Sequence, residues 1–193
     1  MILIVDMNCK NNSLGYYEFV LPIIQVVKSL DECDVRHYLD VGSEELTACD
    51  AIILSGTPLK DNATLSQPEK FQWLKKTEKP VLGICAGMET IGVVYGMHLK
   101  RCLEIGMIPV NIVQENPLVS GCLKAYSLHT ICVEPSADFE IWAKSPNCVQ
   151  MIKHKGKDIY GTLFHPEVRN QEIIRKFIQH KILKNKKIWA GCL

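Results

Sequence analysis

Residues 83–87, Gly-Ile-Cys-Ala-Gly, restrict the local fold more than any other stretch of this chain. The apolar run over residues 80–84 predicts a short buried strand, and residues 86–95 can continue as a helix. A strand that turns sharply into a helix presents its turn residue above the sheet edge, and flanking glycines let the backbones pack closely. Cys85 would then lie at a helix N-terminus, where the dipole favours a thiolate. The pattern indicates a nucleophilic cysteine on a strand-to-helix turn.

A second segment supplies the groups that such a nucleophile needs. Residues 158–164 predict a strand that runs directly into His165-Pro166-Glu167. Because residues two apart on an extended chain share a face, we expect His165 and Glu167 to point the same way. The imidazole would accept the proton of Cys85, and the carboxylate would fix the tautomer of the imidazole. A polar turn after a strand is the alternative interpretation of this tripeptide when it is taken alone.

Four segments, in the same order along the chain, resemble those of a class I glutamine amidotransferase domain. Residues 52–58 resemble the oxyanion-loop segment of the family, residues 83–89 its nucleophile segment, and residues 164–168 its His-Pro-Glu segment. Residues 125–129 are similar to a degenerate form of its glutamine-binding strand. The resemblance implies a triad-type glutaminase that hydrolyses L-glutamine to glutamate and ammonia through a γ-glutamyl thioester.

The resemblance also implies the remaining parts of the site. The backbone N–H groups of Thr57 and Ala86, next to Gly56, would bind the oxyanion. No metal and no organic cofactor are expected. Ammonia would pass to a separate synthetase subunit, which uses ATP if the chain is similar to the stand-alone glutaminase subunits of GMP synthase. Residues 152–155 and 126–128 fit anthranilate- or aminodeoxychorismate-type subunits comparably well.

Three positions depart from the pattern of the family and keep other functions open. Thr57 stands in place of a second glycine, Glu89 replaces a glutamine, and Leu128 follows Ser127 where synthetase-linked members carry a histidine. A histidine, His129, comes one place later. The carboxylate of Glu89 loses amide donors and is expected to raise the pKa of the nucleophile. Alternatives are a binding or regulatory module with weak glutaminase activity and a hydrolase of the same architecture that acts on another amide.

The order of apolar segments predicts the architecture. Strands alternate with helices in the first half, which favours a doubly wound, mostly parallel, flavodoxin-like α/β sheet flanked by helices. Short strands dominate a smaller second half, residues 96–163, and a closing helix is expected over residues 170–183. With 193 residues, we expect one domain, residues 1–193. The expected strands of the first half are residues 1–6, 35–39, 51–55 and 80–84, and its helices are residues 17–30, 67–76 and 86–95.

Charge and cysteine usage narrow the function classes. A formal net charge of +1 gives no reason to expect a nucleic-acid partner, and no apolar run reaches membrane-spanning length. The first residues are too short for a signal peptide. The 9 cysteines include no Cys-x-x-Cys pair and no Cys/His cluster at zinc spacing, so no metal site is predicted. We expect a cytoplasmic protein with reduced thiols.

Overall fold

The computed structural model describes residues 1–180, and a nine-stranded sheet forms the centre of this part. The strand order is β2-β1-β3-β4-β9-β8-β7-β5-β6. The end of the predicted closing helix, residues 181–183, and the residues after it lie outside the described residues. The strands are β1 (Ile2–Asp6), β2 (Cys33–His37), β3 (Ala51–Leu54), β4 (Val81–Ile84), β5 (His98–Ile112), β6 (Cys122–Glu134), β7 (Phe139–Lys144), β8 (Val149–His154) and β9 (Ile159–Thr162).

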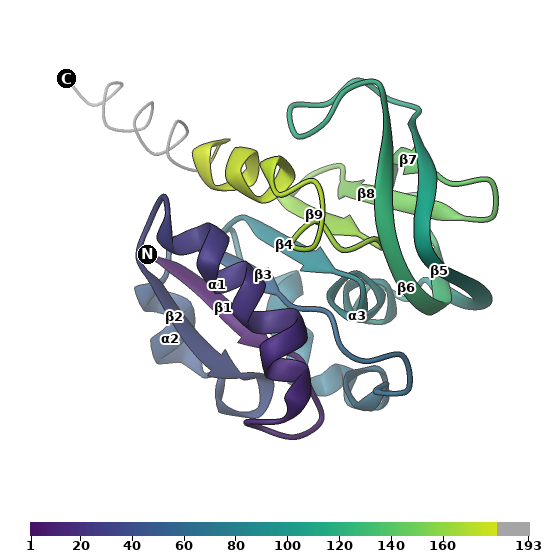
Figure 1. Ribbon diagram of the computed structural model, residues 1–193. Helices are drawn as coiled ribbons and strands as arrows, with labels where there is room; N and C mark the ends of the chain where they lie inside the picture. The colour runs from purple at the N-terminus through teal and green to yellow at the C-terminus, as the bar shows by residue number, and fades with distance from the viewer. Residues whose placement is uncertain (181–193) are drawn as a thin grey trace.

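The first part of the sheet is parallel and is covered on both faces. Strands β2, β1, β3, β4 and β9 run parallel to one another. One apolar cluster joins α1 (Leu21–Lys28) and the C-terminal helix, residues 172–180, to one face. A second cluster joins α3 (Ala86–Val94) and the 3₁₀ helix η4 (Pro68–Lys75) to the other (Figure 1). Because both faces are buried, β1, β3, β4 and β9 are buried throughout.

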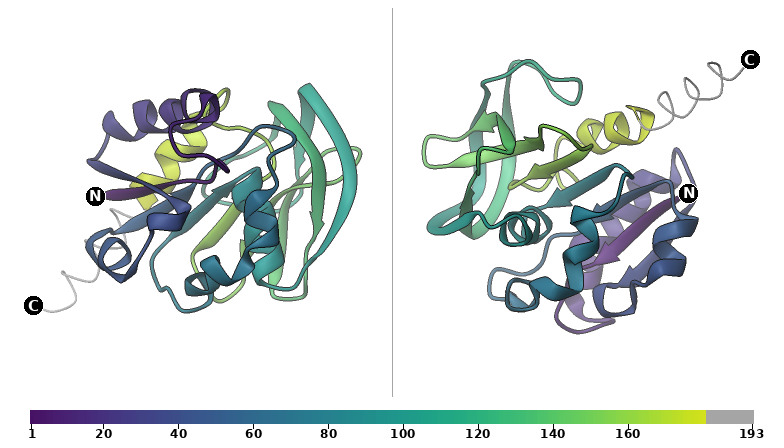
Figure 2. Two further views of the ribbon diagram at one scale, coloured as in Figure 1. Left: turned by 90° about the horizontal axis from the view of Figure 1, so that it is seen from below. Right: turned by 180° about the vertical axis from the view of Figure 1, so that it is seen from behind.

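The second half of the chain extends the same sheet with antiparallel strands. Strands β8, β7, β5 and β6 follow β9, and β5 and β6 form a long hairpin (Figure 2). The predicted α/β architecture, with a strand-rich later part, is confirmed. A single sheet joins the two halves, and one domain over residues 1–193 stays a prediction. None of the helices within residues 1–180 has the length and apolar character needed to cross a membrane.

Several element boundaries differ from the prediction for physical reasons. The predicted helix over residues 17–30 begins as a π-helical turn, η1 (Tyr16–Val20), before α1. The segment predicted as a helix over residues 67–76 is the 3₁₀ helix η4, which buries Phe71 and Leu74. Because residues three apart lie on the same side of a 3₁₀ helix, the spacing of Phe71 and Leu74 suits this type of helix.

Two further differences concern the edge of the sheet that β2 forms. The second strand covers Cys33–His37, ahead of the predicted residues 35–39, and is followed by the 3₁₀ turn η2 (Tyr38–Asp40). The short helix α2 (Ser43–Ala48) was not predicted. It buries no residue and therefore shows no apolar periodicity.

Another short 3₁₀ turn, η3 (Ala63–Ser66), precedes η4.

Candidate active site

Cys85 lies on the tight turn between β4 and α3, as its sequence context predicts (Figure 1). Its backbone has φ 48° and ψ −104°, a conformation that residues other than glycine rarely adopt. The turn is held from both sides, because the N–H of Cys85 donates to Thr162 O at 2.7 Å and the N–H of Glu89 donates to Cys85 O at 2.9 Å. The strained conformation is typical of a nucleophile presented above a sheet edge.

Two glycines allow this turn to pack closely. A Cβ atom on Gly83 would lie 2.6 Å from the carbonyl carbon of Gly87, and one on Gly87 would lie 2.7 Å from the backbone oxygen of Leu54. No side chain fits at either distance. Both glycines therefore serve the close strand-to-helix packing predicted from the sequence.

His165 and Glu167 form a buried pair. His165 Nδ1 lies 2.7 Å from Glu167 Oε1, and both side chains are inaccessible to solvent. The geometry that brings them together is not the predicted strand end, because β9 ends at Thr162. The two residues instead lie in a turn, in which the N–H of Val168 donates to His165 O at 3.2 Å. The N–H of His165 also donates to Tyr126 O at 2.8 Å, which fixes the turn to β6.

Two neighbours hold the imidazole ring of His165 in place. The ring of Phe19, from the π-helical turn η1, packs against it with 5.4 Å between centroids. On another side lies Gly56, where an added Cβ would come within 2.6 Å of His165 Cε1. Sequence reasoning assigned Gly56 to the oxyanion loop and missed Phe19, because an aromatic residue in an apolar helix has no distinguishing pattern.

Burial and the neighbouring charges act in opposite directions on Cys85 and on His165, and burial is the largest effect on Cys85, whose pKa is raised. Burial raises the pKa of Cys85, and the positive charge of His165 opposes this effect. Burial also acts to lower the pKa of His165, but Glu167 and Cys85 together raise it well above its ordinary value. The sequence predicted a thiolate favoured by the helix dipole; here burial works against the thiolate, and His165 is the group that favours it. A side-chain hydrogen bond with Cys85 is among the causes that raise the pKa of His165, and Nε2 makes no other hydrogen bond within residues 1–180.

A narrow cavity opens at Cys85. Residues from the loop after β3, from α3 and from β6 line it: Thr57, Pro58, Leu59, Asn62, Cys85, Glu89, Leu128, His129 and Thr130. Its volume is about 10 Å³, room for about one water molecule. An amide substrate is larger than a water molecule and can therefore enter only if some of these residues move.

The two predicted oxyanion donors, Thr57 and Ala86, both have a backbone N–H without a partner in their own element. Thr57 lines the cavity, and its N–H donates to no group among residues 1–180. The non-glycine residues with positive φ in this part are Asn12, Cys85 and Asn170, so a β-branched residue meets no such strain at position 57. Ala86 is the first residue of α3, where the N–H has no partner within the helix.

Glu89 is a buried carboxylic acid in the wall of the same cavity. Its side chain is 5% exposed and accepts no hydrogen bond from residues 1–180. Burial raises its pKa to about 7, while the charge of His165 acts in the opposite direction. Ionised Glu89 raises the pKa of Cys85, as the sequence predicted. The acid therefore titrates near neutral pH and not in the ordinary range of a carboxylic acid.

The predicted glutamine-binding strand is β6, and three consecutive residues of it have different surroundings. The carbonyl oxygen of Leu128 lies 3.7 Å from Cys85 Sγ, in hydrogen-bonding range for sulfur. Ser127 is fully buried, and its hydroxyl has no partner within residues 1–180. The side chain of His129 is bonded away from the nucleophile, with Nδ1 3.0 Å from Cys102 O and Nε2 3.2 Å from Glu104 Oε2.

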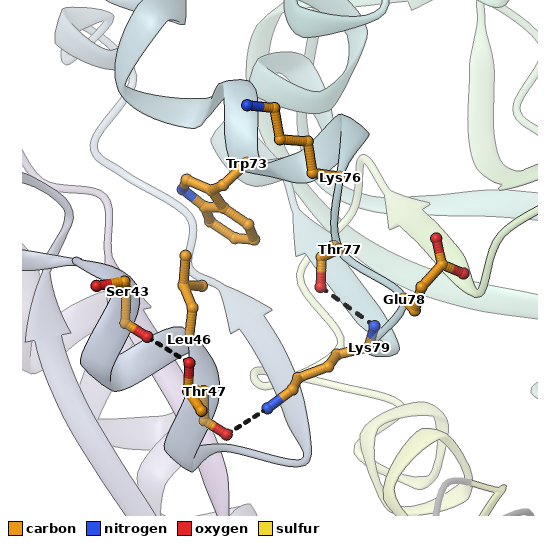
Figure 3. A pocket seen from close by; sticks show the side chains of 8 residues that line it. All are labelled: Ser43, Leu46, Thr47, Trp73, Lys76, Thr77, Glu78 and Lys79. Carbon is orange, nitrogen blue, oxygen red and sulfur yellow. Dashed lines mark hydrogen bonds between the residues drawn. The ribbon is translucent and has the colours of Figure 1, made fainter.

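A wider cavity lies elsewhere. About 540 Å³ in volume, it lies between α2 and the end of η4 (Figure 3). It is lined by Ser43, Leu46, Thr47, Trp73, Lys76, Thr77, Glu78 and Lys79. These residues precede β3 and β4, so the cavity is at the amino ends of strands whose carboxyl ends carry Cys85 and Thr57. Ligands of open α/β sheets bind at carboxyl ends.

The sheet, the strained cysteine and the buried His–Glu pair together define an α/β protein of the cysteine-nucleophile amidase class. The sequence profile described as "Glutamine amidotransferase class-I" matches residues 16–185. The chain therefore belongs to this family, and the predicted family and amidotransferase activity are confirmed.

The names of individual relatives are consistent with this family. A glutamine-hydrolysing GMP synthase subunit from Methanococcus maripaludis strain C6 is 40% identical over 168 residues, 83% of this chain and 81% of the relative. The protein of the same name from Saccharolobus solfataricus is 33% identical over 137 residues, 67% of this chain and 73% of the relative. A solved Thermoplasma acidophilum structure, described as a GMP synthase subunit, has a TM-score of 0.82 at 22% identity, over 98% of both chains. At that identity the likeness establishes the fold alone.

Proposed function

We propose that this chain is the glutaminase subunit of a two-subunit GMP synthase, with Cys85, His165 and Glu167 as its catalytic triad. The observation that carries the proposal is the strained Cys85 turn together with the buried His165–Glu167 pair, in which Nδ1 and Oε1 are 2.7 Å apart. The relatives named as glutamine-hydrolysing GMP synthase subunits support the choice among the amidotransferases. The anthranilate- and aminodeoxychorismate-type alternative has no such support among these relatives.

The chemistry follows from the protonation states of the pair. The thiolate of Cys85 attacks the side-chain amide carbon of L-glutamine and forms a tetrahedral intermediate. His165 then gives its proton to the nitrogen as the carbon–nitrogen bond breaks, which releases ammonia and leaves a γ-glutamyl thioester on Cys85. Water attacks the thioester, His165 takes a proton from it, and glutamate and the thiolate are released. Glu167 stabilises the imidazolium in each step.

The oxyanion of both intermediates is assigned to two backbone N–H groups. The N–H of Thr57 has no other acceptor within residues 1–180, and that of Ala86 begins α3. Loss of one such donor costs roughly a hundred- to a thousandfold in rate. Glu89, Ser127 and Leu128 complete the proposed substrate pocket, in which Gly56 leaves room for the imidazole.

The ammonia acceptor is proposed to be a separate, ATP-dependent synthetase subunit. Strand β5 presents exposed apolar side chains at alternate positions: Leu103, Ile105 and Met107. Ile105 is paired with Leu128, whose carbonyl contacts Cys85. An apolar surface beside the cavity suits a partner that must receive ammonia without loss to solvent. The cytoplasmic location stays a prediction.

Ammonia release from L-glutamine tests the proposal. The full chain is assayed alone and with the ATP-dependent synthetase subunit of the same organism, with Cys85→Ser as the inactive control. We expect slow release by the chain alone, because the cavity holds only about 10 Å³, and glutamine-dependent GMP formation in the mixture. Ammonia release without GMP formation would reject the GMP synthase assignment but keep the glutaminase. Absence of release in both assays would favour a regulatory module.

A further inference from the structure

Three cysteines that are far apart in sequence lie close together in the antiparallel half of the sheet. Cys102 lies on β5, Cys132 on β6, and Cys148 in the connection between β7 and β8. Figure 1 shows the paired strands β5 and β6. Their sulfur atoms all lie within 4.8 Å of one another. Sequence spacing predicted no metal site, because each cysteine comes from a different element and none forms a local pair. The antiparallel half of the sheet brings them together.

A β-bulge helps to collect these side chains. The pairing of β5 with β6 shifts between Arg101 and Glu104, and such a shift re-aims the side chains that follow it. Cys102 belongs to the cluster, and Glu104 contacts it through Cys148. A second group of potential ligands, made of Glu104, His129 and Cys148, is equally compact and shares Cys148 with the first.

The distances suit a tetrahedral thiolate site. Around a zinc ion with bonds of about 2.3 Å to sulfur, adjacent ligands lie about 3.8 Å apart. Glu104 Oε2 is already 3.6 Å from Cys148 Sγ. Sulfur separations of up to 4.8 Å need inward shifts of about 1 Å or less to close around such an ion.

Glu104 borders the three cysteines through Cys148, and its carboxylate must shift toward the other sulfur atoms to become a fourth ligand. Its carboxylate is buried, and among residues 1–180 no lysine or arginine forms an ion pair with it. Gln150 Nε2 donates to Oε2 at 2.6 Å, and Asn147 Nδ2 donates to Oε1 at 2.9 Å. A buried carboxylate is ordinarily paired with a cation or bound to a metal. His129, with Nε2 at 3.2 Å from Oε2, then holds this ligand in position by a hydrogen bond.

A route from solvent reaches the cluster. A cavity of about 220 Å³ is lined by Cys132, Cys148 and Asn147, together with Lys100 and Glu134. It is separate from the cavity that contains Cys85. An ion can therefore enter without passing the active site.

We propose that Cys102, Cys132 and Cys148 form a structural Zn²⁺ site, and that Glu104, which contacts Cys148, moves in as the fourth ligand when the ion binds. A bound ion would tie β5, β6 and the β7–β8 connection together. Strand β6 carries Leu128 and Thr130 into the wall of the active-site cavity, so the ion would also stiffen that wall. Neither the proposed triad nor the amidotransferase chemistry requires the ion, so the site stands or fails separately from the proposed function.

Zinc binding to the full chain tests the proposal. All variants carry Cys85→Ala, because Cys85 and His165 could themselves bind zinc. Protein purified under reducing conditions is stripped with a chelator and titrated with Zn²⁺ against a chromophoric chelator. We expect one equivalent of tightly bound zinc, a loss of affinity of at least about a hundredfold in Cys132→Ser or Cys148→Ser, and no change in the exposed-thiol control Cys122→Ser. Equal affinity in Cys132→Ser and Cys122→Ser would overturn the site.

A second measurement does not depend on the folding of variants. Stoichiometric Zn²⁺ is added to the Cys85→Ala chain, and alkylation of each cysteine is followed by mass spectrometry. Zinc is expected to slow alkylation of Cys102, Cys132 and Cys148 together and to leave Cys122 unchanged. A zinc-bound protein whose three cluster thiols react at the metal-free rate would contradict the assignment. So would a disulfide between two of them in protein prepared with reductant.

Discussion

The imidazole ring of His165 lies directly against the backbone of Gly56, with no room for a Cβ atom between them. A Cβ at position 56 would be 2.6 Å from His165 Cε1 and 3.2 Å from Nδ1. The same ring is bound to Glu167 on one side and packed by Phe19 on another. Residue 56 thus controls the position of the proposed base without contributing a side chain.

Gly56→Ala is therefore expected to displace His165. The methyl group must push the imidazole away from its bond with Glu167, so kcat of glutamine hydrolysis should fall roughly a hundredfold or more, the contribution of a positioned general base. KM should change much less. Steady-state kinetics provide the measurement, and Gly156→Ala is the control, because a Cβ there meets nothing closer than 3.7 Å. Equal, small effects of both substitutions would show that the ring adapts.

Glu167→Gln is expected to change the pH dependence as well as the rate. The carboxylate raises the pKa of His165, so its loss lowers that pKa, and the imidazolium is then lost at a lower pH. The alkaline limb of kcat/KM should move to lower pH, and kcat should fall roughly a hundredfold or more. A pH profile from about 5 to 10 provides the test. A reduced rate with an unmoved alkaline limb would indicate a purely structural role for Glu167.

Much of this site could be predicted, because local chemistry determines it. The turn at Cys85 follows from glycines at positions 83 and 87, which pack so closely against backbone atoms that no Cβ fits. The pair His165–Glu167 was predicted for an incorrect reason: the two groups meet in a turn after β9, not on an extended strand. The chemical pattern was sufficient even though the backbone conformation assumed for it was wrong.

The rest depends on contacts between distant segments. Phe19 reaches His165 across the sheet edge, and Cys102, Cys132 and Cys148 meet through strand pairing. No periodicity within one segment encodes such meetings. The shift of His129 away from the nucleophile has the same origin, since Glu104, on the neighbouring strand, holds it.

The strain at Cys85 gives a prediction about stability. A positive φ of 48° costs a residue with a Cβ roughly 1–3 kcal/mol, and glycine avoids this cost. Cys85→Gly should therefore be more stable than Cys85→Ala by about 1 kcal/mol or more, the reverse of the usual order. Urea unfolding of the two variants gives the difference. For comparison, Ala48→Gly, in the last turn of α2, should show the ordinary order, in which glycine is less stable than alanine. A Cys85→Gly variant less stable than Cys85→Ala would mean that the turn is unstrained.

Glu89 gives a prediction about stability against pH. Burial raises its pKa from 4.5 to about 7 in the folded protein. An acid with a raised folded-state pKa contributes stability below its unfolded pKa, and that contribution is lost as pH rises through the folded value. The loss is complete above pH 7 and amounts to about 3 kcal/mol. Glu89→Gln never ionises, so its stability relative to the wild type should increase between about pH 4.5 and 7 and then level off.

Urea unfolding of wild type and Glu89→Gln at pH 5 and pH 8 measures this change, with exposed Glu69→Gln as the matched control. The same substitution should lower the pKa of Cys85, because ionised Glu89 raises it. Iodoacetamide should then alkylate Cys85 in the variant at lower pH than in the wild type. A stability difference that is the same at both pH values would mean that Glu89 stays ionised in the folded protein. The variant's alkylation profile would still shift to lower pH, because a permanent negative charge beside the thiol would have been removed.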